Sequence, residues 1–163
     1  MSKEHQFIEA AAKEIGAPYI WGGKGTHLFD PVKGLVVSPF IGNDYSTPPL
    51  HVFDCSGLVT WALRQSGGND HRGGYNAQVM QKTFDPLQAN VNRPQLRYYG
   101  SGPDHIFHVA IGVCIVDGKW LVIEAAGGDH TTTTVLMARQ RGACVRLGFE
   151  RRADYVSSSV LPV

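Results

Sequence analysis

One of the three cysteines, Cys55, occupies a position where a nucleophile can be activated. It follows Asp54, a good helix N-cap, and begins a segment with helical apolar spacing. The first turn of a helix has unpaired backbone N–H groups and a partial positive charge, and both stabilise a thiolate. A thiolate can attack a carbonyl carbon to form an acyl-enzyme, and Gly57 keeps the turn slim enough for a substrate to approach. We therefore predict that Cys55 is a nucleophile, and we interpret Cys114 and Cys144 as buried small hydrophobic residues.

A cysteine nucleophile needs a base, and histidine is the usual one because its ordinary pKa of about 6.5 lies near neutrality. Among the seven histidines, His108 heads a segment that alternates like a strand. The residues on its own face, Ala110, Gly112 and Cys114, are small and would leave room for the end of a helix to dock. We predict that His108 is the base. His105 is the second choice, although it would lie on the opposite face of the strand.

A third residue should orient the imidazole, and Glu124 is the main candidate. It lies in an otherwise apolar strand, where an unpaired charge would be costly to bury. A strict two-residue turn at Asp117-Gly118 would place Glu124 and His108 on opposite faces of the hairpin, whereas a three- or five-residue loop would place them on one face. Asp129 and His130 are the fallback candidates.

The elements that must position these residues follow the chain in the order helices, then strands. Apolar spacing predicts helices over residues 3–15, 54–66 and 75–83. Later apolar runs predict strands over residues 96–99, 106–116, 119–126, 132–137 and 143–149. This order is typical of an α+β fold, with N-terminal helices packed on an antiparallel sheet of about five or six strands. No linker interrupts residues 1–163, which we predict to be a single domain.

Residues 24–53 are rich in glycine and proline, so little regular structure is expected there. A loop of this length in a compact domain is usually functional or mobile. The loop holds four side chains of metal-ligating type, but their spacing matches no metal-binding pattern. We therefore predict no metal site from His27, Asp30, Asp44 and His51.

Composition narrows the classes of function. Of the 163 residues, 43% are hydrophobic and 18% are charged, which suits a folded domain with a core. The net charge of +1 argues against nucleic-acid binding, and no apolar run approaches the roughly 18 residues of a membrane span. The first residues lack the features of a secretory signal. We therefore expect a protein that acts where it is made, is delivered by another machine such as a phage particle or a secretion system, or has been trimmed of a leader.

Four segments match, in their order and spacing, the motifs of a known family. They read GAPYIWGG at 16–23, FDCSGLV at 53–59, HVAI at 108–111 and VIEAAGG at 122–128. Together they resemble the NlpC-type (NlpC and p-sixty) cell-wall cysteine peptidases, which share a papain-like catalytic core. The resemblance implies a papain-like fold that needs no cofactor. It also implies that the nucleophile, the base and the orienting residue are Cys55, His108 and Glu124.

The resemblance also suggests substrate-binding residues. Tyr19 matches a tyrosine that lines the site near the oxyanion. Asp54 and Ser56 match residues that help to hold the ammonium in family members that cut next to a free amino terminus. One carboxylate would then have to cap a helix and bind a substrate.

Three departures from the family pattern affect these expectations. The 29 residues at 24–52 form a long loop insertion that could wall the cleft and alter specificity. The usual Pro-Gly-Asp turn is replaced by Arg-Pro-Gln-Leu at 93–96. The third residue is Glu124 rather than the more usual histidine, and its negative charge would raise the pKa of His108.

The function predicted from these observations is hydrolysis of amide bonds in peptidoglycan stem peptides, through a thioester acyl-enzyme at Cys55. The γ-D-glutamyl type of linkage is implied by the resemblance alone. One alternative is an acyltransferase on the same catalytic core, because the acyl-enzyme is shared. The other is a catalytically silent cell-wall-binding module, against which the presence of both Cys55 and His108 argues.

Overall fold

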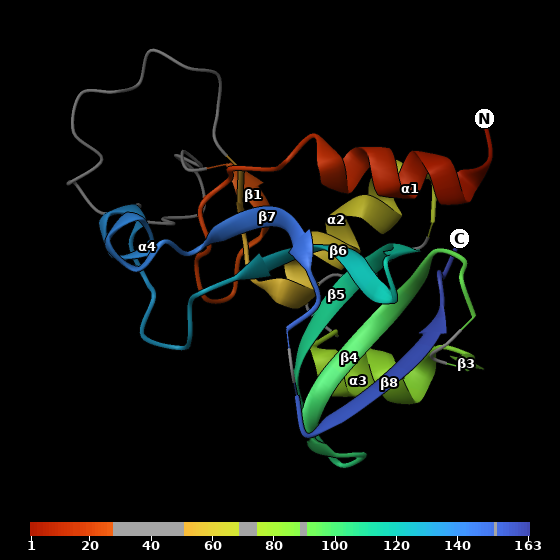
Figure 1. Ribbon diagram of the computed structural model, residues 1–163. Coiled ribbons are helices and arrows are strands. Elements are labelled where there is room, and N and C mark those ends of the chain that lie inside the picture. Colours follow the sequence, from red (N-terminus) through yellow and green to blue (C-terminus); the bar gives the residue numbers. More distant parts are fainter. Residues whose placement is uncertain (28–50, 69–74, 89–90, 152) are drawn as a thin grey trace.

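The computed structural model describes residues 1–27, 51–68, 75–88, 91–151 and 153–163 (Figure 1). Residues 28–50, the greater part of the predicted insertion at 24–52, lie outside the described residues. The two ends of the insertion form short strands, β1 (Lys24–His27) and β2 (His51–Phe53), which pair antiparallel. The expectation of little regular structure over 24–53 is therefore wrong at both ends.

The described residues form four helices, and each begins after a polar side chain that accepts a hydrogen bond from the N–H three residues later. None of these helices is long and apolar enough to cross a membrane. The three predicted helices are confirmed, although the first ends at Ala12 and continues as a turn. The helices are α1 (Lys3–Ala12), α2 (Cys55–Gln65), α3 (Ala77–Thr83) and α4 (Val135–Arg141).

The strand predicted over residues 132–137 is wrong, because α4 begins there. The run of threonines looked like a strand, but the Thr134 side chain accepts a hydrogen bond from the N–H of Met137 and caps the helix. The helix ends at Gly142, whose positive φ of 64° gives the left-handed conformation of a helix C-terminus.

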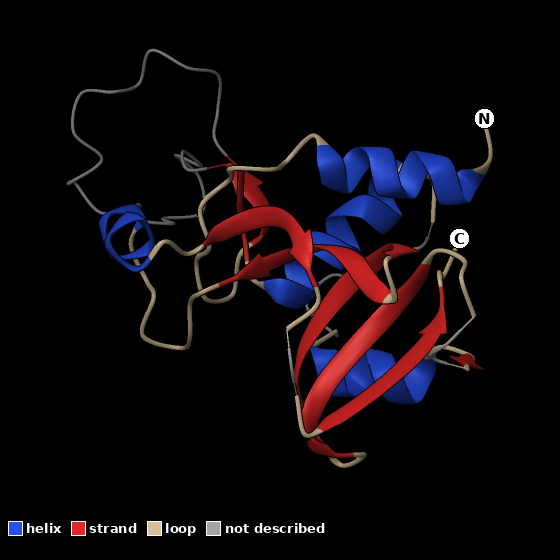
Figure 2. Ribbon diagram, viewed as in Figure 1, coloured by secondary structure: helices blue, strands red, loops and turns tan. Residues whose placement is uncertain are grey.

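A six-stranded antiparallel sheet forms the second layer of the fold, with the strand order β3-β8-β4-β5-β6-β7 (Figure 2). Four of its strands were predicted, whereas β3 and β8 were not. The predicted α+β class is confirmed, as is the expected number of strands. The strands are β3 (Pro86–Leu87), β4 (Gln95–Gly102), β5 (His105–Val116), β6 (Lys119–Ala126), β7 (Cys144–Phe149) and β8 (Tyr155–Val160).

The main core lies between the helices and one face of the sheet. Phe7 of α1 and Leu58 of α2 are buried in one cluster with Tyr98, Ile111 and Ile123 of the sheet. Full burial of a large apolar side chain stabilises the folded state by roughly 1.5–3 kcal/mol. This packing holds α2, and with it Cys55, against the central strands.

The opposite face of the sheet carries a second, smaller cluster, which includes Ala110 and Trp120. Gly112 belongs to this face, because a Cβ there would lie 2.9 Å from the Arg97 side chain and 3.1 Å from the Trp120 ring. The small residues that follow His108 therefore make room for Arg97 and Trp120. The body of α2 packs on the other face, so these small residues do not make room for it, although Cys55 at its first turn still interacts with His108.

Candidate active site

The first turn of α2 is held in place by the residue that caps it. Asp54 Oδ1 accepts a hydrogen bond from the N–H of Gly57 at 2.6 Å. The carbonyl oxygen of Gly23 accepts the N–H of Asp54 at 2.9 Å, and a Cβ on residue 57 would lie 1.8 Å from that oxygen. Glycine is therefore required at position 57, and Gly23 fills the space that was predicted to admit a substrate.

Cys55 is the first residue of α2 and lines a pocket of about 330 Å³, which we call the Cys55 pocket. The walls of this pocket include two exposed aromatic side chains, Trp21 and Phe107. All three cysteines are free and half-buried. Cys114 and Cys144 were predicted to be buried, and they are only partly buried.

His108 lies on β5 and is bound by Glu124. Its Nε2 atom is 2.6 Å from Glu124 Oε2, and its ring packs against Tyr99 at 5.6 Å between centroids. Burial lowers the pKa of His108, but interactions with Cys55 and with Glu124 outweigh burial and raise the pKa to about 9. The raised pKa favours the protonated imidazole at neutral pH, between the sulfur of Cys55 and the carboxylate of Glu124.

Glu124 is a buried carboxylate with partners at both oxygens. Oε2 binds His108, and Oε1 accepts a hydrogen bond from the guanidinium of Arg146, which lies directly opposite on β7. Burial raises the pKa of Glu124, but His108 and Arg146 outweigh it and hold the pKa at about 2. The sequence reasoning missed Arg146. A search of the neighbouring predicted strand for a cation to offset a buried glutamate would have found it.

A β-bulge places Glu124 and His108 on the same face of the hairpin. The turn has two residues, Asp117 and Gly118, both with positive φ, and Val116 pairs with Lys119. Uninterrupted pairing from this turn would place Glu124 and His108 on opposite faces. Val113 is inserted as an extra residue between the paired positions 112 and 114, so the register shifts by one and the two side chains meet.

Tyr19 lies beside Cys55, as expected from the resemblance. It is buried, it lines the Cys55 pocket, and its ring passes so close to Gly128 that a Cβ there would lie 2.2 Å from it. Burial, together with the negative charges of Cys55 and Asp54, raises the pKa of Tyr19 above its ordinary value of 10. The phenol therefore stays protonated and can act as a hydrogen-bond donor.

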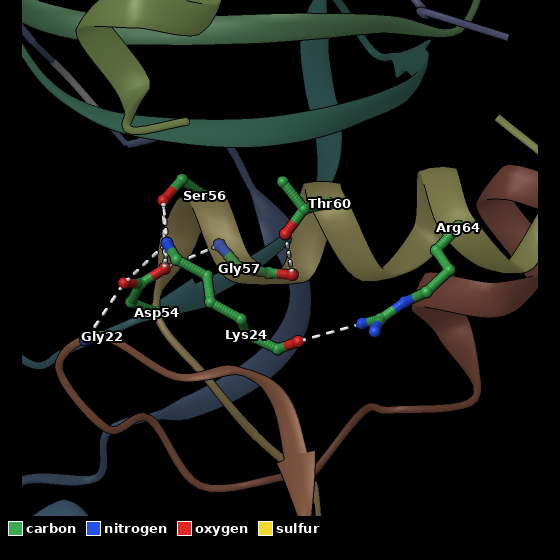
Figure 3. A network of polar contacts seen from close by, with 7 residues as sticks. All are labelled: Gly22, Lys24, Asp54, Ser56, Gly57, Thr60 and Arg64. Atoms are coloured by element: carbon green, nitrogen blue, oxygen red, sulfur yellow. Dashed lines mark hydrogen bonds and ion pairs between the residues drawn. The ribbon is translucent and has the colours of Figure 1, made fainter. Parts of the chain in front are cut away.

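Asp54 and Ser56 do hold an ammonium group, but it belongs to this chain (Figure 3). Lys24 Nζ lies 2.9 and 3.0 Å from the two carboxylate oxygens of Asp54 and 2.7 Å from Ser56 Oγ. Asp54 Oδ2 also accepts the N–H of Gly22, so one carboxylate both caps α2 and ties it to the loop before β1. The sequence reasoning missed Lys24, although it directly follows the Gly22-Gly23 end of a matched motif.

The remaining candidates lie in other surroundings. Asp129 binds Thr131 and Arg141, and the ring of His130 packs edge-on against Trp21. His105 is exposed at the start of β5. Among these candidates and Glu124, the structure places only Glu124 against the His108 ring.

The described residues contain no group of three or more His, Cys, Asp or Glu side chains that could hold a metal ion. Of the four ligand-type residues in the loop, His51 has Nδ1 2.9 Å from a Glu14 carboxylate oxygen. Asp30 and Asp44 lie outside the described residues.

Comparison with known proteins places this geometry in a structural class. No protein-family model and no curated protein matches the sequence. Solved structures do match. The NlpC/p60 domain of the peptidoglycan hydrolase SagA is 24% identical, with a TM-score of 0.54, over 90% of this chain and 88% of that one. The peptidoglycan hydrolase RipB from Mycobacterium tuberculosis is 22% identical, with a TM-score of 0.59, over 99% of this chain but only 65% of that one.

A third match is a protein without catalytic activity. RipD from Mycobacterium tuberculosis, described as a non-catalytic NlpC/p60 domain protein adapted to peptidoglycan binding, is 19% identical, with a TM-score of 0.58, over 98% of this chain and 97% of that one. The chain therefore has the α+β, papain-like fold of NlpC/p60 domains, as its motifs predicted. This fold occurs in peptidoglycan hydrolases and in a non-catalytic binding protein.

Proposed function

We propose that this protein belongs to the NlpC/p60 cysteine peptidases and hydrolyses amide bonds in peptidoglycan stem peptides. The observation that carries the proposal is that the side chains of Cys55, His108 and Glu124 lie next to one another. A thiol at a helix N-terminus interacts with an imidazole whose Nε2 is held by a buried, ionised carboxylate. This is the arrangement that nucleophilic catalysis by cysteine requires.

The proposed reaction starts from an ion pair, in which the thiol proton of Cys55 already resides on His108 before the substrate binds. Because Nε2 is engaged by Glu124, Nδ1 is the nitrogen that exchanges the proton. The thiolate attacks the amide carbon, and the N–H groups of the first turn of α2, with the phenol of Tyr19, stabilise the oxyanion. The imidazolium then protonates the leaving amine, and a thioester remains on Cys55. Water, deprotonated by His108, hydrolyses the thioester, and no cofactor takes part in these steps.

The γ-D-glutamyl linkage is proposed as the bond that is cut, on the strength of the sequence motifs. The ammonium of Lys24 supports cleavage within a stem peptide, because the Asp54 and Ser56 side chains already bind an internal cation. The cell wall is the proposed place of action. Delivery by a phage particle or a secretion system stays a prediction.

The likeness to RipD favours a second candidate, a binding module without activity. Cys55 separates the two. Incubation with purified peptidoglycan, followed by mass spectrometry of the released fragments, should show cleavage products for the wild type and none for Cys55→Ala. Cys114→Ala is the matched control and should cleave normally. Binding without any cleavage by the wild type would establish the module instead.

An acyltransferase would form the same thioester, and partitioning distinguishes it from a hydrolase. Adding an amine at increasing concentration should leave water as the main acceptor. A product that consists mainly of the amine adduct at low amine concentration would identify a transferase.

A further inference from the structure

The imidazole of His108 has two partners at the edge of its ring. Its Nε2 atom lies 2.6 Å from a carboxylate oxygen of Glu124, and the ring also interacts with the sulfur of Cys55. Hydrogen bonds to ring nitrogens lie in the plane of the ring, so neither partner stops the ring from tilting about the line between them. A small misplacement of a catalytic group can cost much of the activity. A contact on the face of the ring would remove this freedom.

Tyr99 supplies a contact on the face of the imidazole. It lies on β4 directly opposite His108 on β5, and the two ring centroids are 5.6 Å apart with 34° between the ring planes. An aromatic ring attracts a cation that lies over its face within about 6 Å of its centroid. The Tyr99 ring can therefore limit the tilt of the imidazole and also favour its protonated form.

The side chain of Tyr99 is itself held in place. It is only 5% exposed and belongs to the smaller apolar cluster of the sheet, together with Trp120. Burial and the negative charge of Glu150 raise the pKa of the phenol, so the hydroxyl keeps its proton near that carboxylate. Glu150 accepts a hydrogen bond from Arg97 Nε at 2.6 Å, and the Arg97 guanidinium lies 4.8 Å from the centre of the Trp120 ring. A packed group of side chains therefore backs the ring that contacts His108.

We propose that Tyr99 is a positioning residue whose ring fixes the plane of the His108 imidazole and stabilises the imidazolium. This proposal rests on the proposed function, because Tyr99 acts on the reaction only through His108. The aromatic face is the part of Tyr99 that acts, and the hydroxyl holds the ring in its place.

Replacing Tyr99 changes no charge around the imidazole. Cys55 faces the imidazole from α2, and Glu124 faces it from β6. Arg146 on β7 binds Glu124, and Arg151 Nε lies 3.9 Å from the same carboxylate. Tyr99 is neutral, whereas all of these groups remain in the variants below. A change in the ionisation of the imidazole would therefore report the loss of the aromatic face.

Nuclear magnetic resonance of the histidine ring protons measures the pKa of His108 without a substrate, and His108→Gln assigns its signal. Tyr99→Leu removes the aromatic face, so the pKa of His108 should fall by about half a pH unit or more. Tyr99→Phe keeps the face and should leave the pKa at its wild-type value. Tyr98→Leu is the matched control, because it removes a buried tyrosine of the same strand that packs in the main core. It should also leave the pKa unchanged.

A second variant covers the case in which Tyr99→Leu does not fold. Pentafluorophenylalanine in place of Tyr99 keeps the ring and its packing but makes the face electron-poor, so the pKa of His108 should be lower than in Tyr99→Phe. An unchanged pKa in this variant and in folded Tyr99→Leu would overturn the proposal. An equal fall in Tyr98→Leu would also overturn it, by showing that any loss of packing in the sheet has the same effect.

Steady-state kinetics tests the effect on the reaction. At neutral pH, Tyr99→Leu should lower kcat at least about fivefold with little change in KM, because the imidazole is free to tilt. Tyr99→Phe should keep at least about half of the wild-type kcat. A wild-type kcat in Tyr99→Leu would overturn the positioning role. Failure of the wild type to cleave any stem peptide would instead contradict the proposed function, and the resonance measurements would still decide whether Tyr99 stabilises the imidazolium.

Discussion

Replacing Glu124 by glutamine removes one negative charge from beside His108 and nearly preserves the shape of the side chain. In the wild type, the carboxylate lies 2.6 Å from His108 Nε2 and, with Cys55, raises the pKa of the imidazolium to about 9 against the effect of burial. The glutamine amide can still contact Nε2, but it carries no charge. We therefore expect the pKa of His108 to fall in Glu124→Gln.

The size of the effect follows from the charge that is lost. An opposite charge within hydrogen-bonding distance changes a pKa by about 1–3 units, so the pKa of His108 should fall from about 9 to between about 6 and 8. The protonated imidazole is needed to protonate the leaving amine, so activity is lost as the pH rises through this pKa. The alkaline limb of the pH–rate profile should move down by at least about one pH unit.

The assay is kcat/KM against pH, from pH 5 to 10, with a defined peptidoglycan fragment. At pH 8.5 the variant should retain about one third of the wild-type activity or less, because most of its imidazole is neutral there. Glu9→Gln, which removes an exposed carboxylate on α1 that is paired with Lys13, should leave the limb unchanged. An alkaline limb at the same pH in the wild type and Glu124→Gln would refute the role assigned to Glu124.

Three further changes have defined outcomes. Arg146→Met should raise the pKa of Glu124 and lower kcat with little change in KM. Arg146→Lys keeps the positive charge and should therefore retain a higher kcat than Arg146→Met. Steady-state kinetics of the two variants checks this. Gly57→Ala should lower the free energy of unfolding by about 1–3 kcal/mol or more, because the added methyl group meets a backbone carbonyl. Gly102→Ala is the control, because it adds a methyl group in open space. Denaturant unfolding measures the stability of both variants. Lys24→Ala should empty the ammonium site beside α2 and increase cleavage of peptides that have a free amino terminus relative to acetylated ones, as product analysis by mass spectrometry would show.

Each of these three predictions has an outcome that would contradict it. Equal loss of kcat in the methionine and lysine variants of Arg146 would mean that its charge is not what matters. Equal stability of the two glycine variants would contradict the close approach at Gly57. An unchanged preference in Lys24→Ala would show that the lysine does not govern which amino termini enter.

Much of the fold could be predicted because its signals are local. Capping, apolar spacing and turn chemistry act within a few residues, and they identified three helices and the β5–β6 hairpin. The threonine run before α4 misled the prediction, since threonine favours strands but also caps helices. The neighbouring strands β3 and β8 at one side of the sheet were missed, and β8 carries three consecutive serines at 157–159 in place of an alternating apolar pattern.

The sequence by itself placed Cys55 at the start of a helix and identified His108 and Glu124 as its candidate partners. It could not determine whether the two partners meet. The turn at Asp117-Gly118 has two residues, as its composition suggests, and by itself would have separated them. The bulge at Val113 brings them together, and no residue pattern around Val113 predicts a bulge.

The tertiary structure alone decided which charges surround the site. Lys24 reaches Asp54 across 30 residues, and Arg146 reaches Glu124 across 22. A single sequence gives residue types and spacing along the chain, but the effect of a charge on a pKa depends on distance in space and on burial. The chemistry of Cys55 was therefore readable from its immediate neighbours, whereas the ionisation of His108 and Glu124 required the folded arrangement.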